Sequence, residues 1–365
     1  LYEDDCLVDY LAKKFQGKDA ILSGPAGGIV GMVHTGQEAG FEQIIGFDMG
    51  GTSTDVSHFS GKFERSFETE VAGVRMRAPM MDIHTVAAGG GSICTFRDGR
   101  FQVGPESAGA DPGPASYRRG GPLTLTDCNV ILGSLAPDHF PSVFGPKGDL
   151  PLDQAAAYTR INELAAHIST NFRSERLAEG FLEIAIQNMA NAIKKISVER
   201  GHDITNYTLQ SFGGAGGQHA CLVAQSLGMR RVMVHPFAGV LSAYGMGLAD
   251  VRALREGQLD CDLYDMSSVD KVLTALSQAV RDELNGQGID SPSLEVRAHL
   301  RYEGSHQALE VSFGKPDDMA SAFEEAHFLR FGFASPNRKL QFEMLSVEAI
   351  GAIGQSPNIE VTFGD

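Results

Sequence analysis

Glycine is concentrated in short clusters, and two of these clusters directly follow apolar runs that have the length of buried strands. The chain has 365 residues, of which 43 are glycine, whereas average proteins contain about 7% glycine. One run, Gln43–Met49, leads into GGTST, and another, Thr208–Phe212, leads into GGAGG. Because glycine lets the backbone turn sharply and approach a ligand closely, these units predict an α/β fold with sites at the strand ends.

Composition excludes several classes of protein. Hydrophobic residues make up 42% and charged residues 21% of the chain, which is enough for a sizeable core in two or three domains. The 46 acidic and 30 basic residues give a net charge of −16, which argues against nucleic acid as a partner. The apolar stretch Pro236–Ala249 is shorter than the about 20 residues that a membrane span needs. Five widely spaced cysteines without a C-x-x-C pair indicate a reduced, cytoplasmic protein, with Cys94 and Cys221 as small buried residues.

Periodicity and turn residues predict the order of the elements. Besides the two strands above, we expect strands at Ala20–Leu22, Asp55–Phe59, Lys62–Glu70, Arg231–His235, Leu294–Tyr302 and Ala308–Phe313. We expect helices at Leu7–Phe15, Ile29–Ala39, Leu152–Ser169, Glu175–Arg200, Gln218–Leu227, Ser267–Leu284 (capped by Ser267 and Asp270) and Asp317–Phe331. Residues 1–260 are predicted to form one core with a proline-rich internal connection near 136–153, and residues 261–365 to form an α+β subdomain.

The glycine loop after the first strand predicts a phosphate site. The strand delivers Asp48 to its end, and Asp55 begins the next strand, so either carboxylate could hold Mg²⁺ directly or through water. The residues between them offer backbone N–H and hydroxyl groups without adding charge, which suits a phosphate chain. The alternative is a tight hairpin whose polar side chains only satisfy the turn. The candidate phosphate-binding residues are Gly50, Gly51, Thr52, Ser53 and Thr54.

The second glycine loop connects a strand to the N-terminus of a predicted helix. That geometry favours an anion or part of a nucleotide, because the helix dipole and unpaired N–H groups point at the ligand. The loop matches neither the dinucleotide fingerprint G-x-G-x-x-G nor a Walker loop. The alternative is close packing of a helix on a strand through glycine. The candidate nucleotide-binding residues are Gly213, Gly214, Gly216 and Gly217.

A third motif, DIHTVAAGGGS, carries Asp82 and His84 two residues apart. In a strand they would share a face, where they could bind a metal or orient a small substrate. A structural pair is the alternative for these residues. Ser23–Gly31 and Gly104–Gly121 are predicted to be further glycine loops.

Taken together, the motifs resemble the hydantoinase A/5-oxoprolinase family, within the superfamily of actin and sugar kinases. Segments FGPKGDLPLD (Phe144–Asp153) and RGHD (Arg200–Asp203) are more similar to its 5-oxoprolinase branch. The matching segments are SGPAGG (Ser23–Gly28), GFDMGGTSTDV (Gly46–Val56), DIHTVAAGGGS (Asp82–Ser92), VGPESAGADPGPASY (Val103–Tyr117), TLTDCNVILG (Thr124–Gly133), FGGAGGQHA (Phe212–Ala220) and GVLSAYGMGLADVR (Gly239–Arg252).

The resemblance implies ribonuclease-H-like, actin/sugar-kinase ATPase lobes that use ATP and Mg²⁺. The segment Asp48–Asp55 resembles the second phosphate loop of that superfamily, with Asp48 as metal ligand, and Gly213–Gly217 resembles its adenosine loop. The whole enzyme would convert 5-oxo-L-proline and ATP to glutamate, ADP and phosphate, with Asp48 and Asp55 as catalytic residues. Asp82 and His84 would contact the substrate.

The absence of an initial Met and of a recognisable first phosphate loop leads us to expect a piece of a longer polypeptide. The resemblance implies a hydantoinase B-like half of the same enzyme as partner, and 5-oxoproline or a related cyclic amide as ligand. Assembly into a homo-oligomer is left open. The alternatives are an ATP-dependent hydantoinase subunit and a non-catalytic module that binds nucleotide to control a partner.

Overall fold

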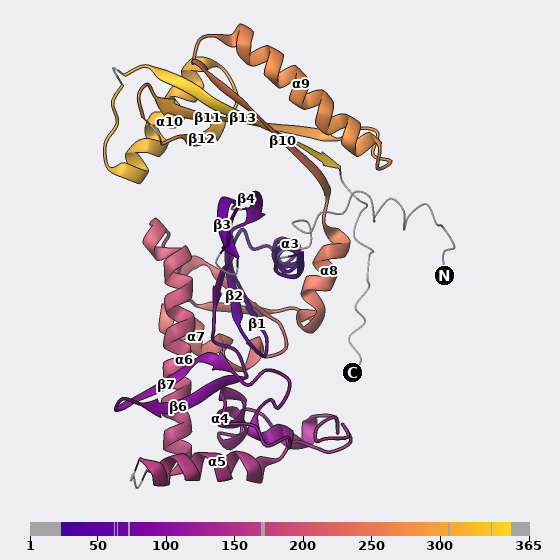
Figure 1. Cartoon of the computed structure of the whole chain (residues 1–365), viewed down its shortest axis with the longest axis vertical. Coiled ribbons are helices and arrows are strands. Elements are labelled where there is room, and N and C mark those ends of the chain that lie inside the picture. The colour runs from indigo at the N-terminus through magenta and orange to yellow at the C-terminus, as the bar shows by residue number, and fades with distance from the viewer. Residues whose placement is uncertain are drawn as a thin grey trace. The chain divides into compact units, whose positions relative to one another are not determined.

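The computed structural model of the chain describes residues 23–61, 63, 65–71, 74–168, 172–305, 307–336 and 338–351. The chain divides into two compact units, Leu1–Gly247 and Leu248–Asp365 (Figure 1). The elements predicted at Leu7–Phe15 and Ala20–Leu22 lie outside the described residues. The boundary predicted at residue 260 falls inside strand β10 (Val251–Asp262).

A five-stranded sheet in the order β5-β2-β1-β8-β9 organises the first unit. Strand β1 (Gln43–Met49) is antiparallel to β2 (Thr54–Ser60) and parallel to β8 (Thr208–Phe212). Strand β9 (Arg231–Val234) is parallel to β8, and β5 (His84–Val86) is antiparallel to β2. The observed bounds of β1 and β8 confirm the prediction, because each strand is a buried apolar run that ends at glycine.

Two helices cover the two faces of this sheet. Helix α6 (Ser174–Ile196) packs its apolar stripe on the face that carries Phe47. Helix α3 (Ser23–Glu38) packs on the opposite face, which carries Ile44 (Figure 1). Alternate residues of β1 therefore serve two separate apolar clusters, as expected for a central strand.

The remaining elements of the first unit surround this sheet. They include two hairpins. The strand predicted over Lys62–Glu70 is observed at Arg65–Val71, where it pairs with its successor in a separate two-stranded sheet, while β5 occupies the place beside β2. Residues 136–153 lie within this unit. The elements are β3 (Arg65–Val71), β4 (Val74–Met81), β6 (Ser92–Arg97), β7 (Arg100–Ser107), α4 (Leu125–Ile131), α5 (Gln154–His167), α7 (Ala220–Leu227) and α8 (Leu241–Leu248).

The prediction of a glycine loop over Ser23–Gly31 is wrong, because these residues form the first turns of α3. Their glycines serve close packing against helix α8 instead. A Cβ atom at Gly27 would lie 2.5 Å from the carbonyl oxygen of Ser242, and one at Gly245 would lie 1.9 Å from that of Gly27. The two helix backbones can approach this closely only where side chains are absent.

The second unit is an antiparallel sheet in the order β10-β13-β11-β12 with two helices. Helix α9 begins one residue earlier than predicted and is capped by Asp265, whose carboxylate accepts from the Ser268 N–H at 3.3 Å. The predicted cap at Ser267 and Asp270 is therefore wrong. Within the described ranges, no helix combines the length and apolar character needed to cross a membrane. The elements are α9 (Met266–Asn285), β11 (Ser293–Tyr302), β12 (Leu309–Ser312), α10 (Pro316–Phe331) and β13 (Leu340–Gly351).

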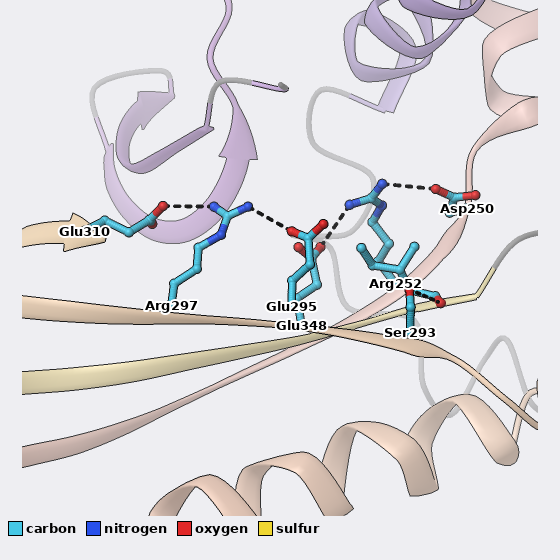
Figure 2. A network of polar contacts seen from close by, with 8 residues as sticks. Asp250, Arg252, Ser293, Glu295, Arg297, Glu310 and Glu348 are labelled. Atoms are coloured by element: carbon cyan, nitrogen blue, oxygen red, sulfur yellow. Dashed lines mark hydrogen bonds and ion pairs between the residues drawn. The ribbon is translucent and has the colours of Figure 1, made fainter. Parts of the chain in front are cut away.

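Ion pairs cross the strands on the face of this sheet that lies opposite helix α9 (Figure 2). Arg252 pairs with Asp250 at 3.0 Å and with Glu348 at 3.5 Å. Arg297 pairs with Glu310 on the neighbouring strand at 3.0 Å. Opposite charges on paired strands favour one register, at about 0.2–1 kcal/mol for each pair.

The glycine contact between α3 and α8 predicts a large difference between two neighbouring substitutions. Gly245→Ala should destabilise the protein by about 1–3 kcal/mol, because its methyl group would overlap the backbone of α3. Gly247→Ala is the matched control: it lies in the same helix, meets no atom within 4 Å, and should be neutral or stabilising by up to about 1 kcal/mol. Urea unfolding of both variants measures the difference, and equal effects would contradict the packing account.

Candidate functional site

Strand pairing brings both predicted glycine loops to one edge of the five-stranded sheet. Asp48 lies opposite Asp55 in the antiparallel register of β1 and β2. The same Asp48 lies beside Phe212 in the parallel register of β1 and β8. Because the carboxyl ends of parallel strands meet at one edge, the loops that follow Met49 and Phe212 become neighbours.

The two loops are also in direct contact. Gly213 has a φ of +79°, and a Cβ atom there would lie 2.4 Å from Oδ1 of Asp48. The N–H of Ala215 donates to the carbonyl oxygen of Met49 at 2.9 Å. The second glycine loop therefore lies against the carboxylate of the first, and only glycine fits at position 213 for both reasons.

The glycines of the second loop divide into two roles. Gly216 is buried, and a Cβ atom there would lie 2.6 Å from Oγ of Ser211, so this glycine serves packing. Gly214 and Gly217 are exposed and face open space. Both interpretations of the loop therefore apply in part. Gly216 permits close packing, and Gly214 and Gly217 are positions that a ligand can reach. Helix α7 begins at Ala220, after a 3-10 turn, rather than at Gln218.

Asp48 is held in an environment that disfavours its charge. Burial raises the pKa of its carboxyl group to about 6, with a further contribution from the negative charge of Asp55. A hydrogen bond from Oγ of Ser242, at 3.5 Å, opposes the shift. Asp55 accepts a shorter bond, 2.6 Å, from Oγ1 of Thr85. Ser242 comes from helix α8, and no feature of the sequence near it indicated this contact.

The first loop presents its tip to solvent. Gly51 and Thr52 are exposed and Ser53 is half-buried, so their N–H groups and hydroxyls are within reach of a ligand. Thr54 differs, because it is fully buried and its hydroxyl donates to the carbonyl oxygen of Ala88 at 2.5 Å. Its side chain serves the structure of the loop.

The segment Gly89–Gly91 supports this loop from behind, a role that sequence reasoning missed. The N–H of Gly91 donates to the carbonyl oxygen of Gly51 at 2.6 Å, and that of Gly90 donates to Gly50 at 3.1 Å. A Cβ atom at Gly89 would lie 2.5 Å from the backbone of Thr52. Three consecutive glycines were the available signal, since such a run permits two backbones to lie together.

Asp82 and His84 are not brought to the Asp48 carboxylate. Strand β5 begins at His84, so the prediction that both residues share a strand face is wrong. Asp82 instead pairs with Arg200 at 2.5 Å. His84 lies opposite Val56 and shares its face, the one covered by α6, while Asp55 points to the other face. Burial, followed by the charge of Lys195, lowers the pKa of His84.

The cysteine predictions have different outcomes. Cys94 is buried, with its sulfur 3.9 Å from that of Cys128. Cys221 is exposed on helix α7, so its prediction as a buried residue is wrong. The buried residues of helix α7 are Ala220, Val223, Ala224 and Leu227, and Cys221 falls on its exposed side.

The Asp48–Asp55 pair fits a hard cation. A positive charge beside the two carboxylates would stabilise the charged form of Asp48, whose pKa is raised, and Mg²⁺ is commonly held by one or two carboxylates together with phosphate oxygens and water. Within the described part of the chain, no three His, Cys, Asp or Glu side chains converge on a point where they could hold a metal.

The buried carboxylate predicts a pH-dependent stability. The pKa of Asp48 in the folded protein, about 6, exceeds its ordinary value of 3.8. The folded protein therefore holds the proton more tightly than the unfolded chain does, and the free energy of unfolding falls as pH rises from 3.8 through 6. Asp48→Asn should therefore stabilise the metal-free protein at pH 7, by about 1–2 kcal/mol after allowance for solvent screening, and much less at pH 4. Asp138→Asn removes an exposed acid and is the control. Urea unfolding at both pH values decides, and an equal effect at each would contradict the prediction.

Comparison with known proteins places these motifs in a family. The sequence profile described as Hydantoinase/oxoprolinase matches residues 10–255. 5-Oxoprolinase 1 of Arabidopsis thaliana is 44% identical, and the match covers 93% of this chain and 28% of that protein. Caprolactamase subunit alpha of Pseudomonas jessenii is 31% identical, with 94% of this chain and 51% of the relative covered. The chain therefore spans 28% to 51% of the length of these curated relatives.

Two solved structures share the fold. The crystal structure of ATP-dependent caprolactamase from Pseudomonas jessenii has a TM-score of 0.80 at 28% identity, and covers 93% of this chain and 51% of its own. Nucleotide-free acetone carboxylase has a TM-score of 0.70 at 24% identity, with 91% of this chain and 50% of its own covered, which shows likeness of fold alone. Both confirm the mixed α/β class. Because the family profile covers most of the chain and the motifs lie within its bounds, the chain belongs to the hydantoinase/oxoprolinase family.

Proposed function

We propose that this chain forms the ATP-activating part of an ATP-dependent cyclic-amide hydrolase, and that the substrate of the whole enzyme is 5-oxo-L-proline. The observation that carries the proposal is the placement of Asp48 between two glycine loops at one sheet edge. The similarity to 5-oxoprolinase 1 supports the choice of lactam, and the likeness to ATP-dependent caprolactamase supports the use of ATP.

The proposal includes a ribonuclease-H-like ATPase lobe in the first unit, within the core predicted over residues 1–260. The sheet order supports it, since β2 alone runs against its neighbours in a sheet otherwise parallel to β1. In such sheets ligands bind beyond the carboxyl ends of the parallel strands. Both glycine loops lie at that end.

Different residues at this edge of the five-stranded sheet would bind different parts of Mg-ATP. The N–H groups of Gly51, Thr52 and Ser53 would bind phosphate oxygens, and the open positions Gly214 and Gly217 would lie against the nucleoside. Asp48 and Asp55 would hold Mg²⁺, which supplies charge neutralisation to the phosphates when bound. Charge neutralisation and positioning account for most of the catalysis of phosphoryl transfer.

Phosphoryl transfer solves the chemical problem that a lactam presents. Its amide carbonyl is stabilised by resonance and is a poor electrophile. Transfer of the γ-phosphoryl group to the carbonyl oxygen breaks its bond to the bridging oxygen of ATP, releases ADP and opens the carbonyl carbon to attack by water. The C–N bond then breaks, the nitrogen takes a proton, and the ring opens to an acyl phosphate. A second water hydrolyses this acyl phosphate to the carboxylate and phosphate. We assign the activation step to this chain, and ring opening to a hydantoinase B-like half. The name caprolactamase subunit alpha supports a division between partners.

The proposal predicts Mg-ATP binding that depends on one carboxylate. Full-length enzyme should bind Mg-ATP by calorimetry and release phosphate when 5-oxo-L-proline is added. Asp48→Ala should weaken binding at least about tenfold, equivalent to about 1.4 kcal/mol, while Asp138→Ala, which removes the same charge from an exposed 3-10 turn, should not.

The outcomes separate the remaining functions. Phosphate release stimulated by a hydantoin or another lactam, but not by 5-oxo-L-proline, would assign the enzyme to a related cyclic amide. Nucleotide-dependent binding of a partner without any lactam-stimulated phosphate release would favour the non-catalytic module. Absence of Mg-ATP binding by the full-length wild type would refute the ATPase proposal.

A further inference from the structure

Helix α4 (Leu125–Ile131) carries three polar side chains and yet is completely buried. All seven of its residues are buried, among them Thr126, Asp127 and Asn129. Burial of a polar side chain is unfavourable unless its hydrogen bonds are made inside the protein. The partners of these side chains therefore indicate what the helix is for.

Asp127 secures the helix itself. Its carboxylate accepts from the N–H of Thr124 at 2.8 Å, closing a capping box, and from the N–H groups of Ala115 and Ser116 at 3.0 and 2.8 Å. The buried charge is thus surrounded by backbone donors. Helix α4 is fixed at its N-terminus to the glycine- and proline-rich loop that precedes it.

Thr126 connects the helix to the first phosphate loop. Its N–H and its Oγ1 both donate to the carbonyl oxygen of Gly90 at 2.8 Å. The N–H of Gly90 in turn donates to the carbonyl oxygen of Gly50. A Cβ atom at Gly90 would lie 2.8 Å from Oγ1 of Thr126 and 3.8 Å from Cβ of Ala215, so this residue lies between α4 and the second loop.

Asn129, three residues later on the helix, connects it to the second loop. Its Nδ2 donates to Oε1 of Gln218 at 2.8 Å and lies 3.2 Å from Nε2 of His219. His219 is fully buried, and burial lowers its pKa to about 4. The imidazole is therefore neutral at pH 7, and Nε2 can accept the second hydrogen of the amide.

We propose that helix α4 is the positioning element of the site, with Thr126 holding the Gly50–Thr52 loop through Gly90 and Asn129 holding the Gly213–Gly217 loop through Gln218 and His219. Residues three apart on a helix project from the same side, so one rigid turn sets the separation of two loops that come from distant parts of the chain. The inference rests on the proposed function in one respect: the separation matters because both loops contact one nucleotide.

Each positioning residue has a separate test in the full-length protein without nucleotide. Thr126→Val keeps the shape and removes the hydroxyl donor, so amide hydrogen exchange should accelerate in residues 89–91. Asn129→Leu removes both donors, so exchange should accelerate in residues 213–219. Thr126→Ser keeps the hydroxyl and should exchange at the wild-type rate. The control is Tyr158→Phe in helix α5. It removes a hydrogen bond to the carbonyl oxygen of Ile131, which lies in α4 but away from both loops.

The second readout is steady-state kinetics with ATP as the varied substrate. Thr126→Val should raise KM for ATP about tenfold, the value for loss of one buried hydrogen bond, with a smaller change in kcat. Asn129→Leu, which removes two donors, should raise KM for ATP at least as much. Thr126→Ser and Tyr158→Phe should keep the wild-type KM. Unchanged exchange in both loops, or a KM for ATP that rises equally in Tyr158→Phe, would overturn the inference. Failure of wild type to bind ATP, with the exchange pattern as expected, would count against the proposed nucleotide function and leave the role of α4 supported.

Discussion

The parallel pairing of β1 with β8 is the constraint on which the site depends. It aligns Ile44 with Thr208 and Asp48 with Phe212, although the two strands are far apart in the sequence. Both strands end at the same edge of the sheet, so this pairing alone makes the loops that follow them neighbours. The central position of β1, with β2 antiparallel on its other side, adds Asp55 to the same edge. The two registers of β1 together bring to one edge the loops and carboxylates that we assign to the nucleotide.

Close approach of backbones is what makes the assembly compact. At Gly213, Gly89 and Gly245, a single methyl group would overlap a neighbouring backbone or carboxylate. Among them, Gly213 lies against the Asp48 carboxylate, and burial of that carboxylate is the main cause of its raised pKa. Packing and electrostatics are linked here, because the close approach at Gly213 helps to bury the carboxyl group that a cation would stabilise.

The sequence was a good guide to local structure and a poor one to the use of particular residues. Strands β1 and β8 could be placed to the residue, since a buried run that ends at glycine has few interpretations. The glycines of Ser23–Gly31 predict a loop but lie in a helix, because glycine indicates either a turn or a close contact, and the contact partner Gly245 lies in a helix far along the chain. The spacing of Asp82 and His84 predicts that they share a strand face, but the strand begins only at His84. Asp82 lies before it and forms an ion pair with Arg200. Ser242 and helix α4 were missed because their roles exist only in the tertiary structure.

The environment of Asp48 links folding, proton binding and ligand binding. Asp55 receives a short bond from Thr85, whereas Asp48 receives only a long one from Ser242 and is the carboxyl group with the pKa near 6. A proton on Asp48 competes with any cation for the same oxygens, so cation binding below pH 6 must release that proton. At neutral pH the unneutralised carboxylate lowers the stability of the folded protein. This is the pattern expected of a site that binds a ligand of opposite charge. We propose that the Asp48 loop binds a ligand, and a buried acid beside a second acid favours this interpretation over a turn that only satisfies its own backbone.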